Sequence, residues 1–221
     1  MNLEALIAEF RLRRDDTVSP YDWSDEEIVS YINEAITEAC ERARLIEDRT
    51  TPTVCRLALS IGKANYTLHP SVLKVKRVAF NGQTLPETSV EAMDDADPEW
   101  ESKEGAEPKL FILENDTGLR VYPTPTAAGV LTMTVYRDQL TSLSVDKPDE
   151  SPEIHERYHP RLMHWAYRCA MLKRDSVTYN PDGAAAEEAV FARHFGTRQD
   201  ANVVRKQRDR RPPIVKSSWP S

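Results

Sequence analysis

Three histidines close together are the first side chains in this sequence that could do chemistry. His155, His159 and His164 lie within ten residues, in the run His-Glu-Arg-Tyr-His-Pro-Arg-Leu-Met-His. Histidines four residues apart on a helix share one face and can ligate a metal, as in a metal-dependent hydrolase. Pro160 interrupts that geometry before the third histidine. We therefore expect no metal site, and assign these histidines to packing at a helix start and to the surface.

Other catalytic patterns are missing. The sequence has no G-x-S-x-G elbow, and its 7 glycines form neither a Walker loop nor a dinucleotide-binding fingerprint. Its three cysteines, Cys40, Cys55 and Cys169, are odd in number and widely spaced, which favours free buried thiols over disulfides or zinc. We expect a protein that is not an enzyme and needs no cofactor.

An acidic stretch covers residues 87–107, where nine acids face only Lys103. A pair of carboxylates here could in principle serve a glycosidase, but such a pair needs one partly buried acid. A solvated acidic loop with a helical turn around residues 91–94 is the preferred interpretation. The acids expected to form an exposed surface on this loop are Glu91, Asp94, Asp95, Asp97, Glu99 and Glu101.

The C-terminal tail has the opposite charge. From Ala201 onward it carries six basic residues against Asp209, whereas the whole chain has a net charge of −7. The tail could bind DNA phosphates, stay solvated, or become ordered on a neighbouring protein. We favour the third reading, with basic side chains pairing to acids and apolar ones as anchors: Arg205, Lys206, Arg208, Arg210, Arg211, Ile214, Val215 and Trp219.

The elements that must carry these residues begin with helices. Residues 3–14 show apolar side chains at helical spacing. Ser24 and Glu27 then form a capping-box pattern that starts a helix reaching about residue 47. No apolar run approaches the length needed to cross a bilayer, and no signal-peptide core is present, so we expect a soluble intracellular product without a membrane partner.

A block of short strands follows. Alternating apolar residues predict strands over 53–61, 65–68 and 72–80, with Asn81-Gly82 as a hairpin turn. A second hairpin is expected over 109–122, and a last strand over 130–137. Ser151-Pro152 offers a helix cap, and Pro160 disfavours helix at His159, so a short turn should precede a helix over 160–174. Asn180-Pro181 starts a final helix that ends near Gly196.

This order predicts an α+β fold, a helical bundle with an inserted antiparallel β domain and an extended C-terminal arm. The expected parts are the N-terminal helices (1–50), the β domain (51–145) with its acidic loop (87–107), the C-terminal helices (146–198) and the basic arm (199–221).

Several segments resemble head–tail connector proteins of tailed bacteriophages. Residues 23–27 (Trp-Ser-Asp-Glu-Glu) and 31–35 (Tyr-Ile-Asn-Glu-Ala) resemble their opening helix. Residues 66–70 (Tyr-Thr-Leu-His-Pro) and 119–125 (Leu-Arg-Val-Tyr-Pro-Thr-Pro) are similar to their β region. Residues 152–166 and 191–196 resemble the start and end of their C-terminal helices. The resemblance spans residues 20–200 and rests on the order of these segments, because none of them is a chemical motif.

The resemblance implies a structural adaptor in the neck of the virion, made in the host cytoplasm. It implies a ring, usually dodecameric, that binds the portal protein and tail or nozzle proteins, while double-stranded DNA passes through its channel without specific binding. The basic arm would dock on the portal, and the acidic loop would face the channel or the tail. A tail-tube or baseplate component is the alternative, and a metal-dependent hydrolase using His155, His159 and His164 is the remote one.

Overall fold

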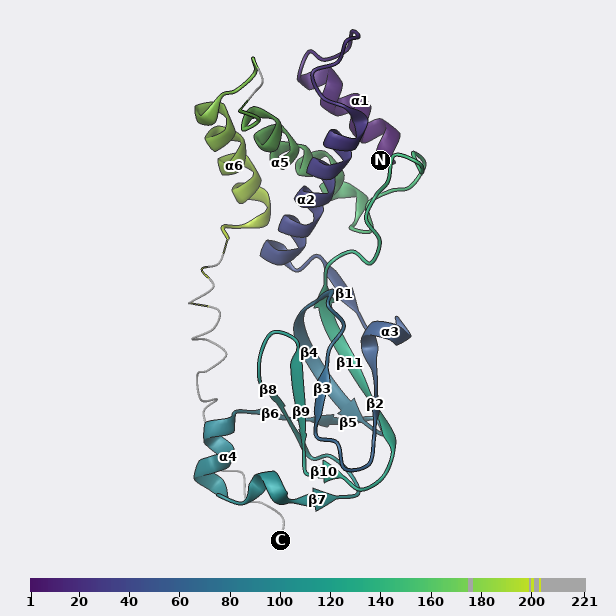
Figure 1. Cartoon of the computed structure of the whole chain (residues 1–221), viewed down its shortest axis with the longest axis vertical. Helices are drawn as coiled ribbons and strands as arrows, with labels where there is room; N and C mark the ends of the chain where they lie inside the picture. Colours follow the sequence, from purple (N-terminus) through teal and green to yellow (C-terminus); the bar gives the residue numbers. More distant parts are fainter. Residues whose placement is uncertain (175–176, 199, 201–202, 204–221) are drawn as a thin grey trace. The chain divides into compact units, whose positions relative to one another are not determined.

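The computed structural model describes residues 1–174, 177–198, 200 and 203, and it confirms an α+β fold (Figure 1). The chain divides into two compact units. The first, here called the helical unit, contains Met1–Ile46 and Arg137–Arg198. The second, the β unit, contains Glu47–Tyr136. The chain enters the β unit through strand β1 and leaves it through β11, and these two strands are neighbours in one sheet.

The N-terminal helices of the helical unit start where their sequence predicts, but the second ends at Ala43 and not near residue 47, because Arg44 adopts left-handed angles and Ile46–Asp48 forms strand β1. Helix α1 spans Leu3–Arg13 and α2 spans Asp25–Ala43. The capping box at the start of α2 is complete: the Ser24 hydroxyl accepts from the Glu27 amide, and the Glu27 carboxylate accepts from the Ser24 amide. Three side chains in the first turn are acidic, which the positive end of the helix dipole stabilises.

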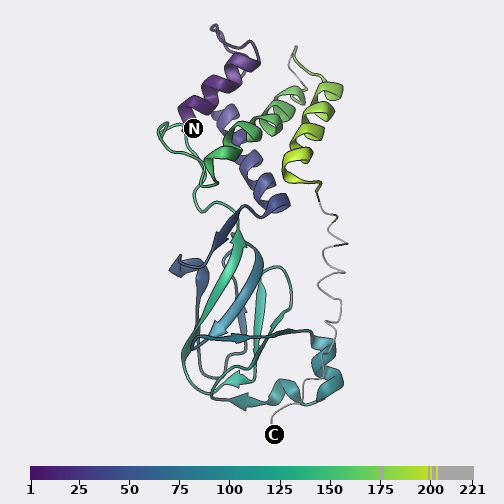
Figure 2. The ribbon, with the colours of Figure 1, turned by 180° about the vertical axis from the view of Figure 1, so that it is seen from behind.

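The C-terminal helices are α5 (His159–Met171) and α6 (Pro181–Phe195), and a short 3-10 helix, η2 (Glu156–Tyr158), precedes α5. The two helices lie side by side in both views (Figures 1 and 2). Asn180 caps α6 through its side chain, and Gly196 ends it with a φ of 90°. This boundary agrees with the sequence prediction.

Two predictions at the start of α5 were wrong. Pro152 begins no helix, because residues 151–155 form no regular structure. His159 adopts helical angles (φ −53°, ψ −48°) although a proline follows it. Its side chain is buried and bonds the Ile154 carbonyl, so tertiary packing overrides the local preference that proline imposes.

The β unit packs two main sheets around one apolar core. The first sheet has the order β1-β11-β4-β5, with β2 also paired to β11. The second has the order β3-β9-β8-β6, and the short strands β10 and β7 pair in parallel. Core side chains come from both main sheets, including Val78, Leu131 and Val135 from the first and Leu119 and Val121 from the second.

The strands are short, as the sequence pattern indicates. In the first sheet they are β1 (Ile46–Asp48), β2 (Arg56–Leu59), β4 (Val72–Phe80), β5 (Gln83–Leu85) and β11 (Gly129–Arg137). The others are β3 (Asn65–Thr67), β6 (Glu87–Thr88), β7 (Glu104–Gly105), β8 (Leu110–Leu113), β9 (Gly118–Tyr122) and β10 (Thr124–Pro125).

Both expected hairpins are present. Asn81 and Gly82 have φ values of 48° and 82°, as a type I′ turn requires, and they join β4 to β5. Strands β8 and β9 pair antiparallel around residues 114–117. The strand predicted over 53–61 starts late, because Pro52–Cys55 forms a helical turn, α3. Pro52 at the first helical position has its fixed φ already suited to that turn.

Candidate docking surfaces

The acidic segment is a folded module and not the solvated loop that its composition suggests. It contains helix α4 (Val90–Ala96), the 3-10 helix η1 (Trp100–Ser102) and strands β6 and β7. Ser89 caps α4 by accepting from the Ala92 amide. The helical turn expected around residues 91–94 is therefore confirmed within α4.

Trp100 is the anchor of this module. Its side chain is buried against Met93 and Ile112, and its indole nitrogen donates to Asp94 Oδ1 at 2.7 Å. The guanidinium of Arg120 lies over the Trp100 ring at 4.4 Å, where cation–π attraction stabilises it. Two sides of the tryptophan are thus held by charged groups, so the module has a defined shape.

The predicted acids consequently divide into two groups. Asp94 holds Trp100, Glu101 pairs with Arg120 at 2.8 Å, and Asp97 pairs with Lys103. The Lys103 hydrogen bond lowers the pKa of Asp97 below its ordinary value. Glu91 and Glu99 are exposed. The structure also places Asp95 on the exposed surface of α4.

The predicted arm residues, Arg205, Lys206, Arg208, Arg210, Arg211, Ile214, Val215 and Trp219, all lie outside the described residues. The structure does describe the last residues before that segment. Arg198 donates to Glu38 Oε2 at 2.8 Å, although its own side chain is largely exposed. This contact ties the residues that follow α6 to helix α2.

Glu38 belongs to a larger buried network that sequence reasoning missed. Arg42 donates to Glu38 Oε1 at 2.7 Å and to the Gly196 carbonyl at 3.1 Å. The Arg42 guanidinium also lies over the rings of Trp165 (5.0 Å) and Phe191 (5.2 Å). The network therefore connects α2, α5, α6 and the C-terminal exit, and fixes where the chain leaves the helical unit.

The three candidate metal-binding histidines have separate roles. His155 accepts from the Arg157 amide at 3.2 Å and so begins the 3-10 helix. His159 Nε2 donates to the Ile154 carbonyl at 2.9 Å, and His164 Nδ1 lies 2.6 Å from Glu187. Among the described residues, no three His, Cys, Asp or Glu side chains form a group that could hold a metal ion.

The interpretation that these histidines do not match the zinc-peptidase motif was wrong on spacing. His155, Glu156 and His159 fit the HExxH spacing of zinc peptidases. That motif works only when both histidines project from one face of a continuous helix. Here His155 precedes the 3-10 helix, and His159 is the buried first residue of α5. Both side chains are committed to backbone hydrogen bonds, so the arrangement does not suit zinc.

The cysteines are free thiols, and two of them have raised pKa values. Burial raises the pKa of both Cys40 and Cys169 to about 12, so their thiols stay protonated near neutral pH. Cys40, Cys55 and Cys169 form no disulfide. No helix within the described part of the chain is both long and apolar enough to span a membrane.

Comparison with known proteins gives one result. A family model described as SU10 adaptor protein matches residues 1–216, which is nearly the whole sequence. No curated protein matches it. By the family match, the chain belongs to the SU10 adaptor protein family, a group of structural adaptors consistent with a role at the phage head–tail junction.

Proposed function

We propose that this protein is a head–tail adaptor that forms a ring beneath the portal of a tailed phage. The ring, dodecameric like the portal it would follow, continues the DNA channel and gives tail or nozzle proteins a surface to dock on. The observation that carries this proposal is the family match over residues 1–216. Structural adaptors of phage particles are not a class of enzyme, and their place is the neck of the virion.

The charge distribution supports passage of DNA through the channel without binding to its wall. The β unit carries 13 acidic residues against 9 basic ones, and the whole chain has a net charge of −7. A channel wall of this sign repels phosphates and does not release condensed counterions from the duplex. Double-stranded DNA can therefore slide past such a ring without specific binding.

The C-terminal arm is the segment that we assign to the portal. Its six basic residues and the apolar side chains of Ile214, Val215 and Trp219 suit an arm that orders on an acidic, grooved partner. The contact between Arg198 and Glu38 supports this assignment, because it fixes the point from which the arm starts.

A truncated chain ending at Asp200 tests the arm. We expect it to lose binding to the cognate portal while its circular dichroism spectrum keeps the helix and sheet signals of the full chain. A matched control keeps the arm and replaces only Arg198 with alanine, which should weaken binding far less. Portal binding by the truncated chain at full strength would refute the role given to the arm.

The acidic module is assigned to the channel wall or to the tail-facing side. Glu91 and Glu99 are exposed, and neither holds Trp100, so both can be changed to lysine without disturbing the module. We expect the double change to impair tail joining or DNA retention in assembled particles. If the particles join tails and retain DNA as before, the module serves neither the channel wall nor the tail-facing side.

A further inference from the structure

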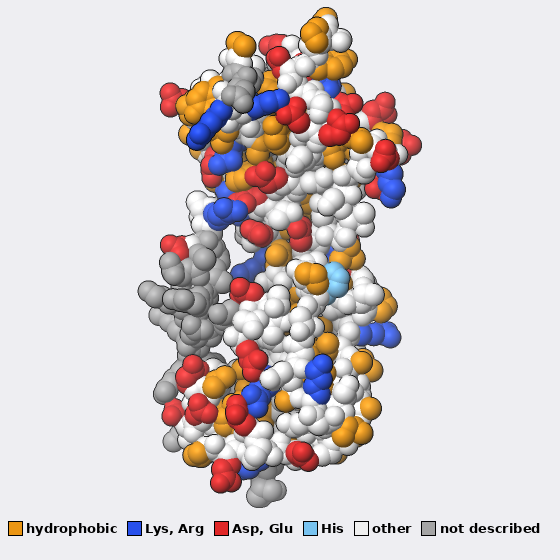
Figure 3. Space-filling view, in the orientation of Figure 1, with side chains coloured by type: hydrophobic (Ala, Val, Ile, Leu, Met, Phe, Trp, Pro, Cys, Tyr) orange, Lys and Arg blue, Asp and Glu red, His pale blue; other side chains and the backbone are white. Residues whose placement is uncertain are grey.

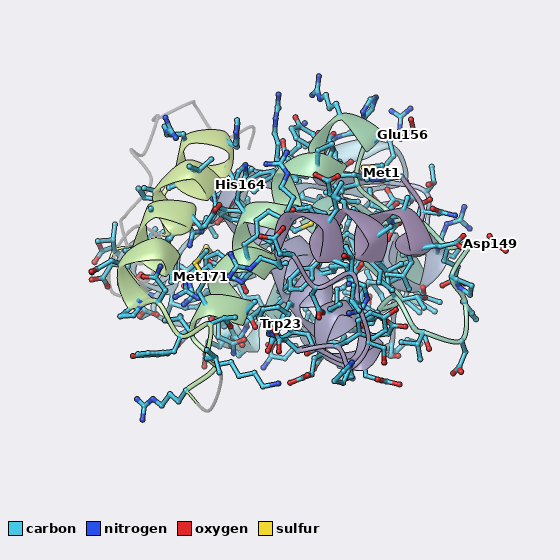
Figure 4. All side chains as sticks on the ribbon, turned by 90° about the horizontal axis from the view of Figure 1, so that it is seen from above. Met1, Trp23, Asp149, Glu156, His164 and Met171 are labelled. Carbon is cyan, nitrogen blue, oxygen red and sulfur yellow. The ribbon has the colours of Figure 1, made fainter. Side chains whose placement is uncertain are left out.

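One side of the helical unit gathers positive charge. Arg161 and His164 come from α5, and Arg193 and His194 from α6; we call these four the cationic face. The rings of His164 and His194 stack with centroids 6.1 Å apart, which brings the two helices' side chains into one surface. Both arginines and His194 are exposed. Figure 4 shows His164 beside α6.

The cationic face has one acidic partner in the described part of the chain. Glu187, at 2.6 Å from His164, is the one acid paired with it among the described residues. Neither Arg161 nor Arg193 forms an ion pair within the described part of the chain. Loss of hydration and the nearby charges of Arg161, His164 and Arg193 lower the pKa of His194. The two arginines therefore carry the positive charge of this face near neutral pH.

A different side of the same unit gathers unpaired negative charge. Glu4 begins α1, and its amide donates to the Pro148 carbonyl at 3.0 Å, so it lies beside the loop that carries Asp146 and Asp149. We call Glu4, Asp146 and Asp149 the acidic edge. All three are exposed, and none forms an ion pair among the described residues. Figure 3 shows acidic side chains along this edge of the unit, and Figure 4 places Asp149 far from His164.

We propose that the cationic face of one copy packs against the acidic edge of the next copy in the ring. This inference rests on the proposed function, because it names the contact by which the proposed ring closes. A ring requires a heterologous interface, in which two unlike surfaces of each copy meet. Two separated patches of opposite charge on one rigid unit provide such surfaces, and like-charged pairings in other orientations are disfavoured.

The charge balance argues against the other occupants of the cationic face. The chain's own C-terminal tail is basic and would be repelled. Duplex DNA would meet two arginines and two histidines on a helical unit that carries 21 acidic and 14 basic residues. Nonspecific DNA binding depends on the summed field of the protein, which is negative here.

Two charge-reversed proteins and their mixture test the pairing. The first carries Arg161→Glu with Arg193→Glu, and the second carries Glu4→Lys with Asp149→Lys. Alone, each places like charges at every interface, and association between copies should weaken roughly a hundredfold. An equal mixture can alternate around an even-numbered ring with every interface again complementary, so association should return close to that of the unchanged protein. Association between copies is measured by sedimentation of the full chain and by cross-linking on the portal.

Controls separate this inference from the proposed function. A variant with Arg161→Lys and Arg193→Lys keeps the charge and should associate normally. Binding of single copies to the portal is measured in parallel, so loss of copy-to-copy contact with portal binding kept supports the inference. The inference is overturned if the mixture does not regain association while circular dichroism shows that both variants are folded. Salt-sensitive duplex binding that the first variant alone loses would also overturn it, in favour of DNA.

Discussion

The helical unit and the β unit are stabilised in different ways. Four of the charged or polar side chains that are almost fully buried belong to the helical unit: Asp16, Glu38, Arg137 and His159. The core of the β unit is built from apolar side chains, and its one such polar residue, Asp48, accepts from the amides of Thr50 and Thr51.

This difference indicates different demands on the two units. Each buried charge in the helical unit has a partner, such as Arg11 for Asp16 at 2.6 Å and Arg42 for Glu38. Such pairs add little net stability over apolar packing, but losing one partner is costly. We infer that the network of Glu38 and Arg42 fixes the residues that follow α6 against α2, through the Gly196 carbonyl and Arg198. The β unit depends on shape and on apolar area.

The largest effect should follow from a cavity in the β core. Leu131 on β11 is fully buried, so Leu131→Ala should lower the free energy of unfolding by about 4 kcal/mol. The neighbouring Val130 is about half exposed (48%), and Val130→Ala is the matched control with an effect near zero. Urea unfolding followed by circular dichroism measures both. Equal losses from the two changes would contradict the assigned core.

The next effect should come from breaking a buried ion pair in the helical unit. Glu38→Gln leaves the Arg42 guanidinium, whose side chain is 2% exposed, without its closest carboxylate. We expect a loss of about 3 kcal/mol in the free energy of unfolding. Changing both Glu38 and Arg42 to methionine should restore most of it, because no unpaired charge then remains buried. If the double variant is as unstable as the single one, the pair itself supplies the stability.

A smaller effect is expected at the start of α2. Ser24→Ala removes one hydroxyl of the capping box and should cost about 1 kcal/mol, whereas Ser24→Asp should keep most of the stability. Ser30, exposed within the same helix, serves as the control through Ser30→Ala. Thermal unfolding of the four proteins would show whether the capping residue is specific in its effect.

The smallest effect concerns pH. The Lys173 side chain, 2.7 Å from Glu27, lowers the pKa of that carboxyl below its ordinary value of 4.5. A lowered pKa means that the pair stabilises the folded state above about pH 4.5 and that this contribution is lost as the pH falls further. The stability difference between the unchanged protein and Glu27→Gln should therefore shrink below that pH. Both side chains are partly exposed, so high salt should shrink it as well.

Local signals predicted much of the fold. The strand over 72–80 with Asn81-Gly82 after it, and the capping box at Ser24, were readable because neighbouring residues alone determine them. The helical turn at Pro52–Cys55 and the helical angles of His159 were not, since both oppose the local pattern. For His159, packing against the Ile154 carbonyl decides the conformation.

The candidate surfaces were less readable. One tryptophan within the acidic run, Trp100, was a signal that this segment has a small core of its own, and it could have been used. The network around Glu38 joins residues 160 positions apart to each other, as with Arg198, and no local pattern announces such a contact. The cationic face depends equally on two helices meeting, because His164 and His194 come from different elements.

Electron microscopy of the full chain mixed with its cognate portal, beside the chain alone, is the most direct test of the central claim. We expect a ring stacked coaxially on the portal, with added density from the C-terminal arm on the portal surface. Absence of association with the portal at every salt concentration would refute the role of head–tail adaptor and would favour a tail-tube or baseplate component.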